Sequence, residues 1–152
     1  ERQLEFLDEQ LAKVDELIEE HIESDDDLRG KSERMQQLKG VGPVLAATLL
    51  AYVPELGDIE DAQLSALVGV APYARDSGAS HRPRHIRGGR GTVRHVLYMA
   101  AVAAIRHNRI LAAFYQRLIA AGKPPMVCIV AVMRKMLLVI NRLVADPQFT
   151  LA

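Results

Sequence analysis

The chain has 152 residues, of which 49% are hydrophobic, so it is large enough for one globular domain with a core. A single cysteine excludes a disulfide framework, and no apolar run reaches membrane-spanning length without charge, so we expect an intracellular protein with no membrane partner. The formal net charge is zero, but residues 1–33 carry thirteen acidic and four basic residues, whereas residues 34–152 carry six and fifteen. A basic body joined to an acidic arm indicates nucleic acid as a partner.

The acidic arm, residues 1–33, is predicted to be a solvated helix with one apolar seam. Apolar residues recur at spacings of three and four, at Leu4, Leu7, Leu11, Val14 and Ile18. Two interpretations stay open: an amphipathic helix packed on its own domain, and a coiled coil with another subunit or a partner helix. We expect the acidic surface to keep the arm away from nucleic acid. Ser24 and the three aspartates at 25–27 are predicted to form a turn or a helix cap and not a metal site.

Residues 35–53 predict a helix-hairpin-helix motif at the start of the basic body. Residues 40–42 form a tight glycine turn, and Pro43 occupies the first position of the second helix. In such a motif the glycines let backbone N–H groups approach a phosphate, and the second helix directs its positive end toward it. The alternative is a plain helical hairpin. We favour binding of the DNA backbone, without sequence reading, by Lys39, Gly40, Val41 and Gly42.

The stretch 73–95 is rich in arginine and glycine and contains the hydroxyl side chain of Ser77. It contains six arginines and three histidines against one acid, Asp76. Guanidinium groups match phosphate geometry, so the predicted DNA- or RNA-binding residues are Arg75, Arg82, Arg84, Arg87, Arg90 and Arg94. Ser77 lies in this field beside Gly78; taken alone, it is a turn former that follows Asp76. Because its glycines and like charges lack their partner, we expect 73–92 to be mobile without nucleic acid.

The remaining stretches predict helices and no strand. A short helix follows the acids at 58–61 and ends at Gly69, and an almost wholly apolar helix begins at about Val93 and is interrupted at 106–109. A third helix ends at the loop 121–125, and a last one covers 126–144. The predicted fold is therefore all-α: an acidic coiled-coil arm at 1–33 and a compact basic helical domain at 34–152.

Five short motifs follow one another in the basic body. They are LKGVGP at 38–43, LVGVAP at 67–72, Ser77-Gly78, RGGR at 87–90 with Arg94 and Leu97, and AVMRK at 131–135. In this order they resemble the C-terminal domain of the DEDD-type insertion-sequence transposases, the IS one-ten family, which is related to Piv-type DNA invertases. The similarity covers about 35–145, and the acidic arm resembles the coiled coil that precedes this domain in the family.

The resemblance implies a DNA transposase or recombinase that moves an element through circular intermediates. Ser77 occupies the position of the family's serine and is the expected catalytic nucleophile, with Ser80 as the second choice. No general base is evident: His81, His85 and an acid from another domain are all open. The family's RuvC-like nuclease domain, with four acidic residues, lies outside this chain. We therefore expect no metal or cofactor here, magnesium in that domain, and no activity of this fragment alone.

The resemblance also implies the partners and the place of action. DNA is the expected partner, and many family members use a guide (bridge) RNA as well. We expect a homo-oligomer formed through the N-terminal helix, in the bacterial cytoplasm at the nucleoid. An alternative function is a non-catalytic DNA- or RNA-binding and dimerisation module, in which the hairpin and the arginines only hold the backbone.

Overall fold

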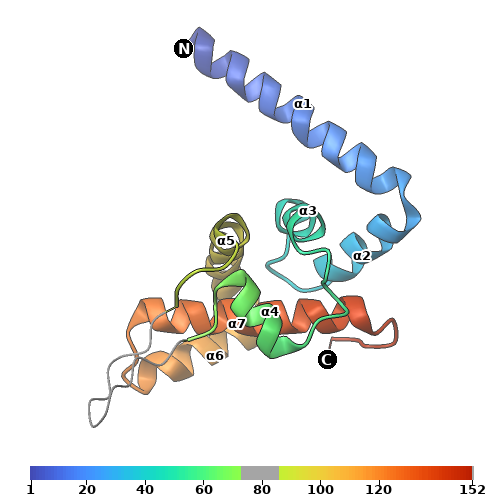
Figure 1. The fold of residues 1–152 in the computed structure, drawn as a ribbon. Coiled ribbons are helices and arrows are strands. Elements are labelled where there is room, and N and C mark those ends of the chain that lie inside the picture. The colour runs from blue at the N-terminus through green and yellow to red at the C-terminus, as the bar shows by residue number, and fades with distance from the viewer. Residues whose placement is uncertain (73–85, 152) are drawn as a thin grey trace.

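The protein is all-helical in the residues that its computed structural model describes, 1–72 and 86–151, which confirms the predicted fold class (Figure 1). In this part of the chain no helix combines the length and the apolar character that crossing a bilayer requires. The helices, in chain order, are α1 (Arg2–Ser24), α2 (Asp26–Gln36), α3 (Pro43–Tyr52), α4 (Asp61–Val68), α5 (Gly91–His107), α6 (Arg109–Ala120) and α7 (Pro125–Ala145).

The body is built around α5, which packs against α3, α6 and α7. The buried residues of α5 recur every three or four positions and so form one stripe: Val93, Leu97, Ala101 and Ala104. The alanines let neighbouring helices approach closely, and α7 contributes the larger core side chains, among them Met133, Met136 and Leu137. This confirms the central buried helix that the apolar run predicted.

The helix boundaries follow the local chemistry of the sequence. Asp25 caps α2, because its side chain accepts hydrogen bonds from the backbone N–H groups of Asp27 (2.9 Å) and Leu28 (3.1 Å). Pro43 is the first residue of α3, and Gly69 ends α4 with a left-handed φ of 80°. The predicted cap before α2, the helix start at Pro43 and the helix end at Gly69 are confirmed, whereas the helix-hairpin-helix motif stays a prediction.

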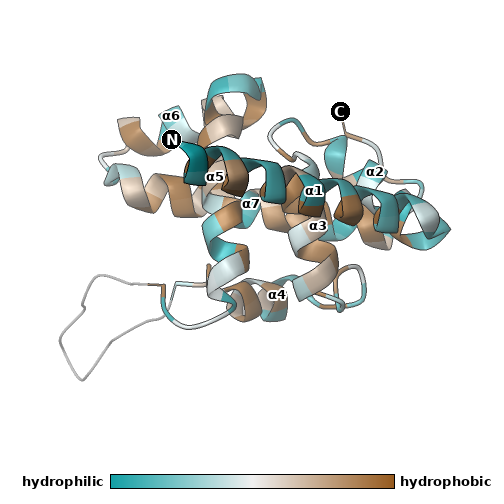
Figure 2. Cartoon of the chain, turned by 90° about the horizontal axis from the view of Figure 1, so that it is seen from above, coloured by the Kyte–Doolittle hydropathy of each residue, from teal (hydrophilic) through white to brown (hydrophobic). Residues whose placement is uncertain are grey.

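The helix of the acidic arm, α1, projects away from the body, and no residue of it is buried (Figure 1). Its hydrophobic residues alternate with hydrophilic ones along the helix (Figure 2). Leu4, Leu11 and Leu17 are each more than 60% exposed. The structure therefore does not show α1 packed on the body, whereas the part of the arm in α2 packs against α3 and α7. The coiled-coil interpretation stays a prediction.

The hairpin between α2 and α3 is joined to the C-terminal end of α5. Gly40 has a φ of 111°, and a Cβ atom placed on it would lie 2.5 Å from the Cβ of Ala104. The side-chain amide of Asn108 donates a hydrogen bond to the backbone carbonyl of Lys39 (3.2 Å). Gly40 is thus required both for the turn and for the close approach to α5.

The contact at Gly40 predicts that Gly40→Ala destabilises the protein by about 2 kcal/mol or more, because both the positive φ and the missing space oppose a side chain. Gly30, inside α2, is the matched control. A Cβ there would meet nothing within 4 Å, so Gly30→Ala should stabilise by about 0.5–1 kcal/mol. Urea unfolding of both variants measures the difference. Equal effects of the two substitutions would contradict the packing described for Gly40.

Candidate nucleic-acid interface

The predicted site residues divide into those that the structure describes and those that it does not. The nucleophile Ser77, the arginines Arg75, Arg82 and Arg84, and the histidines His81 and His85 lie outside the described residues. The described ones fall into two groups: the hairpin residues Lys39, Gly40, Val41 and Gly42, and the arginines Arg87, Arg90 and Arg94.

The chain segments on either side of 73–85 are joined by what we call the glycine junction: Gly69, Gly88 and Gly89. Gly69 ends α4, and Gly88 and Gly89 precede α5; all three have positive φ. A Cβ on Gly69 would overlap the carbonyl of Gly88, and one on Gly89 would overlap the backbone nitrogen of Gly69. The backbone N–H of Arg90 also donates to the carbonyl of Leu67 (2.9 Å). The two motifs that flank 73–85 are therefore fixed side by side.

Arg90 is hydrogen-bonded to residues of the connection between α3 and α4. Its two terminal nitrogens donate to the two carboxylate oxygens of Glu55 (2.9 and 2.8 Å), and one of them also donates to the carbonyl of Tyr52 (2.5 Å). The hydrogen bond from Arg90 lowers the pKa of Glu55 from its ordinary 4.5 to about 2, and the same bond raises the pKa of Arg90. The predicted contact of Arg90 with nucleic acid stays a prediction.

Arg87 and Arg94 differ in exposure. The guanidinium of Arg94 donates to the carbonyl of Gly88 and so supports the glycine junction, whereas Arg87 is exposed at its edge. Together with the bonds of Arg90, these contacts join the backbone at 88–90 to the end of α4 and the start of α5. The predicted mobility of 73–92 stays a prediction: residues 86–92 are at most half-buried, and 73–85 lies outside the described residues.

The hairpin offers fewer backbone donors than the sequence indicated. The N–H of Val41 is already bonded to the carbonyl of Leu38 (2.9 Å), and Gly40 faces α5. Lys39 is exposed, and Gly42, the residue before α3, has open space around its Cα. No acidic side chain lies in the first turn of α3. The features that suit a phosphate are thus Lys39, Gly42 and the positive end of α3.

The two groups of predicted site residues lie at opposite ends of α5. The glycine junction precedes the first residue of α5, while the hairpin contacts Ala104 and Asn108 near the last one. Seventeen helical residues span about 25 Å. Sequence reasoning missed this separation, and it also missed Glu55, which the sequence marks only as an acid after a proline.

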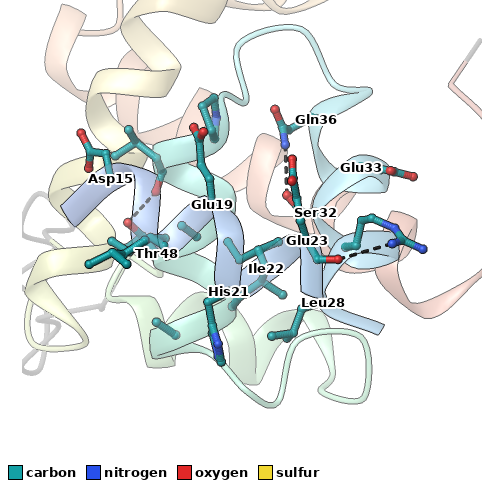
Figure 3. Close-up of a pocket in the computed structure, with 18 of the residues that line it drawn as sticks. Asp15, Glu19, His21, Ile22, Glu23, Leu28, Ser32, Glu33, Gln36 and Thr48 are labelled. Atoms are coloured by element: carbon teal, nitrogen blue, oxygen red, sulfur yellow. Dashed lines mark hydrogen bonds between the residues drawn. The ribbon is translucent and has the colours of Figure 1, made fainter. Parts of the chain in front are cut away.

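A groove of about 1270 Å³ lies between α1 on one side and α2 and α3 on the other (Figure 3). Apolar residues such as Ile22 and Val44 line it, and Asp15, Glu19 and Glu33 lie around it. Its carboxylates disfavour a phosphate ligand. Within residues 1–72 and 86–151, no three His, Cys, Asp or Glu side chains come together as a metal site.

The ion pair of Glu55 predicts a pH dependence of stability. A lowered pKa means that the stabilisation is complete above about pH 4.5 and is lost as the pH falls toward 2. The difference in melting temperature between the wild type and Glu55→Gln should therefore be largest near neutral pH and disappear near pH 2. Asp58→Asn, which removes a neighbouring exposed carboxylate, is the control. A wild-type advantage over Glu55→Gln that persists unchanged down to pH 2 would contradict the pairing.

The sequence of this chain is similar to proteins of insertion elements. Residues 32–116 match the family described as "Transposase IS116/IS110/IS902 family". The "Insertion element IS116 uncharacterized 44.8 kDa protein" of Streptomyces clavuligerus is 35% identical over 108 residues, which are 68% of this chain and 25% of that protein. The chain thus spans about a quarter of the length of this curated relative. The family match covers more than half of the chain and includes the hairpin, the glycine junction and α5. This chain belongs to the IS116/IS110/IS902 family of transposases.

Proposed function

We propose that the chain is the DNA-binding, serine-bearing part of a transposase that cuts and rejoins DNA as an insertion sequence moves. The family membership is the observation that carries this proposal. The basic charge of residues 34–152 supports DNA as the partner. The glycine junction supports a functional segment at 73–85, because it fixes both flanks of that segment against α5.

The proposed reaction is nucleophilic attack on a backbone phosphate. The hydroxyl of Ser77 gives up its proton as its Oγ forms a bond to phosphorus, the bond from phosphorus to one sugar oxygen breaks, and the departing oxygen takes up a proton. Rejoining reverses these steps with a different strand end. Arginines of the loop stabilise the charge that develops on the phosphate oxygens, as preorganised guanidinium groups do elsewhere.

The proposal assigns the metal chemistry to the rest of the full-length protein. The described residues of this chain do not fit a magnesium site, since no three carboxylates come together there. A DEDD-type, RuvC-like nuclease domain would supply the four acids, and magnesium bound there would polarise the scissile phosphate. The same proposal includes a relation to Piv-type invertases and the use of a guide RNA. It places the protein in the cytoplasm at the nucleoid, and it expects this part of the protein to be inactive alone.

Assembly through α1 is part of the proposed function. The apolar seam of α1 is exposed over almost its whole length, and residues such as Leu4 (66%) and Leu11 (62%) find no cover in the body. An exposed apolar seam of this size on a charged helix favours pairing with a second helix. We propose that α1 forms a coiled coil between subunits.

Ser77→Ala in the full-length protein should abolish strand exchange while the affinity for DNA stays unchanged, because only the nucleophile is removed. A DNA substrate nicked next to the reacting phosphate should trap a covalent adduct in the wild type, and peptide mapping should place it on Ser77. Ser80→Ala is the control and should retain strand exchange. Normal strand exchange by Ser77→Ala would leave the non-catalytic binding module as the better description.

Arg87 and Arg90 should differ in their effect on DNA binding. Arg87→Gln removes an exposed charge, so the plot of log affinity against log salt should become less steep by about 0.9. The double substitution Glu55→Gln with Arg90→Gln removes a neutralised pair and should leave the slope unchanged. Fluorescence anisotropy with a labelled duplex measures both. A larger change for the pair than for Arg87 would mean that Arg90 contacts the DNA itself.

A further inference from the structure

The connection between α5 and α6 is a basic corner, residues 106–109. It reads Arg-His-Asn-Arg, and Arg106, His107 and Arg109 are all exposed. Asn108 ends α5 and caps α6, because its side-chain oxygen accepts hydrogen bonds from the N–H groups of Ile110 (3.1 Å) and Leu111 (3.2 Å). The corner is thus a defined turn between two fixed helices.

The corner is attached directly to the hairpin. The same Asn108 side chain that caps α6 donates from its amide nitrogen to the carbonyl of Lys39. Gly40 lies against Ala104, one turn before the corner. The exposed Lys39, Arg106 and Arg109 therefore lie at the same end of α5, and we call these three residues the Lys39–corner surface.

No carboxylate of α5, α6 or α7 balances the charge of the corner arginines. Residues 77–145 contain twelve lysines and arginines and no Asp or Glu, so α5, α6 and α7 carry no acidic side chain. Within the described residues, the ion pairs involve Arg29, Lys31 and Arg90 and none of the three side chains of the surface. A surface of one sign attracts a polyanion.

The position of Arg109 is unfavourable for folding. It is the first residue of α6, where the helix dipole disfavours positive charge, and the first turn contains no acid that would offset it. Arg106 lies at the C-terminal end of α5, where its positive charge interacts favourably with the helix dipole, and its side chain is exposed. Fold stability gives no reason for Arg109, which is the pattern expected of a residue kept for binding.

We propose that the Lys39–corner surface is a second contact for the phosphate backbone of duplex DNA. This proposal rests on the proposed function, which makes DNA the partner, and adds a site and a geometry to it. Arg106 and Arg109 join the hairpin in one contact at the C-terminal end of α5, and Arg87 lies in another at the N-terminal end.

The length of α5 sets the spacing of the two contacts. They lie about 25 Å apart, which corresponds to about seven base pairs along a duplex. The exposed residues of α5 recur at 95, 99, 103 and 106, with spacings of four, four and three, so they form one stripe that leads from the glycine junction to the corner. A duplex that follows this stripe would extend from the N-terminal end of α5 to Arg106 at the corner.

The test compares two double variants of the full-length protein, bound to a labelled duplex of about twenty base pairs over a range of salt concentrations. Arg106→Gln with Arg109→Gln should make the plot of log affinity against log salt less steep by about 1.8, because two phosphate contacts are lost. Arg117→Gln with Arg142→Gln is the control of equal charge. The guanidinium group of Arg117 lies over the ring of Phe114, and that of Arg142 lies over the ring of Phe149. Removing these two charges should leave the salt slope nearly unchanged.

A conservative variant keeps the test independent of folding. Arg106→Lys with Arg109→Lys preserves both charges and should retain the wild-type slope. A wild-type slope for the Arg→Gln pair, or an equal loss for the control pair, would overturn the second contact while the proposed function stands. Binding of structured RNA but not of duplex DNA by the wild type would overturn it as well. If the wild type binds no nucleic acid, the proposed function itself fails.

Discussion

Close backbone contacts at glycines fix the two ends of α5, and the arrangement of the basic body depends on them. At one end, Gly40 brings the hairpin against Ala104; at the other, Gly69 and Gly89 bring the end of α4 against the start of α5. A side chain at any of these positions would separate the segments. Because a buried helix of fixed length lies between the two contacts, the distance between the hairpin and the glycine junction is fixed as well.

Acidic and basic residues are separated between the helices of this arrangement. The helices α5, α6 and α7 carry only basic and neutral side chains, whereas Glu55 is bonded to Arg90 and most other acids lie in α1 and α2. The basic side chains of the central helix α5 therefore lie near its two ends, and α1 projects away from the body (Figure 1). Such a separation favours a polyanion on the body and a protein partner on the arm.

The helices and their ends could be predicted from the sequence, because their signals are local. A proline at the first position of α3, an aspartate before α2 and a glycine after α4 each act within one helical turn. The site could be predicted only as a set of residue types. Arg90 and Arg87 look alike in the sequence, yet Arg90 is bonded to Glu55, thirty-five residues away, and Arg87 is exposed. The placement of the hairpin at the far end of α5 from the arginines depends on tertiary packing, which no local pattern encodes.

The central claim is that duplex DNA contacts the body at both ends of α5. Hydrogen exchange of the full-length protein, with and without duplex DNA, tests it most directly. Slower exchange in the presence of DNA is expected for the backbone amides of 39–44 and 86–92, with no change in α4. Slower exchange at one of these segments alone, or only in α1, would contradict the claim.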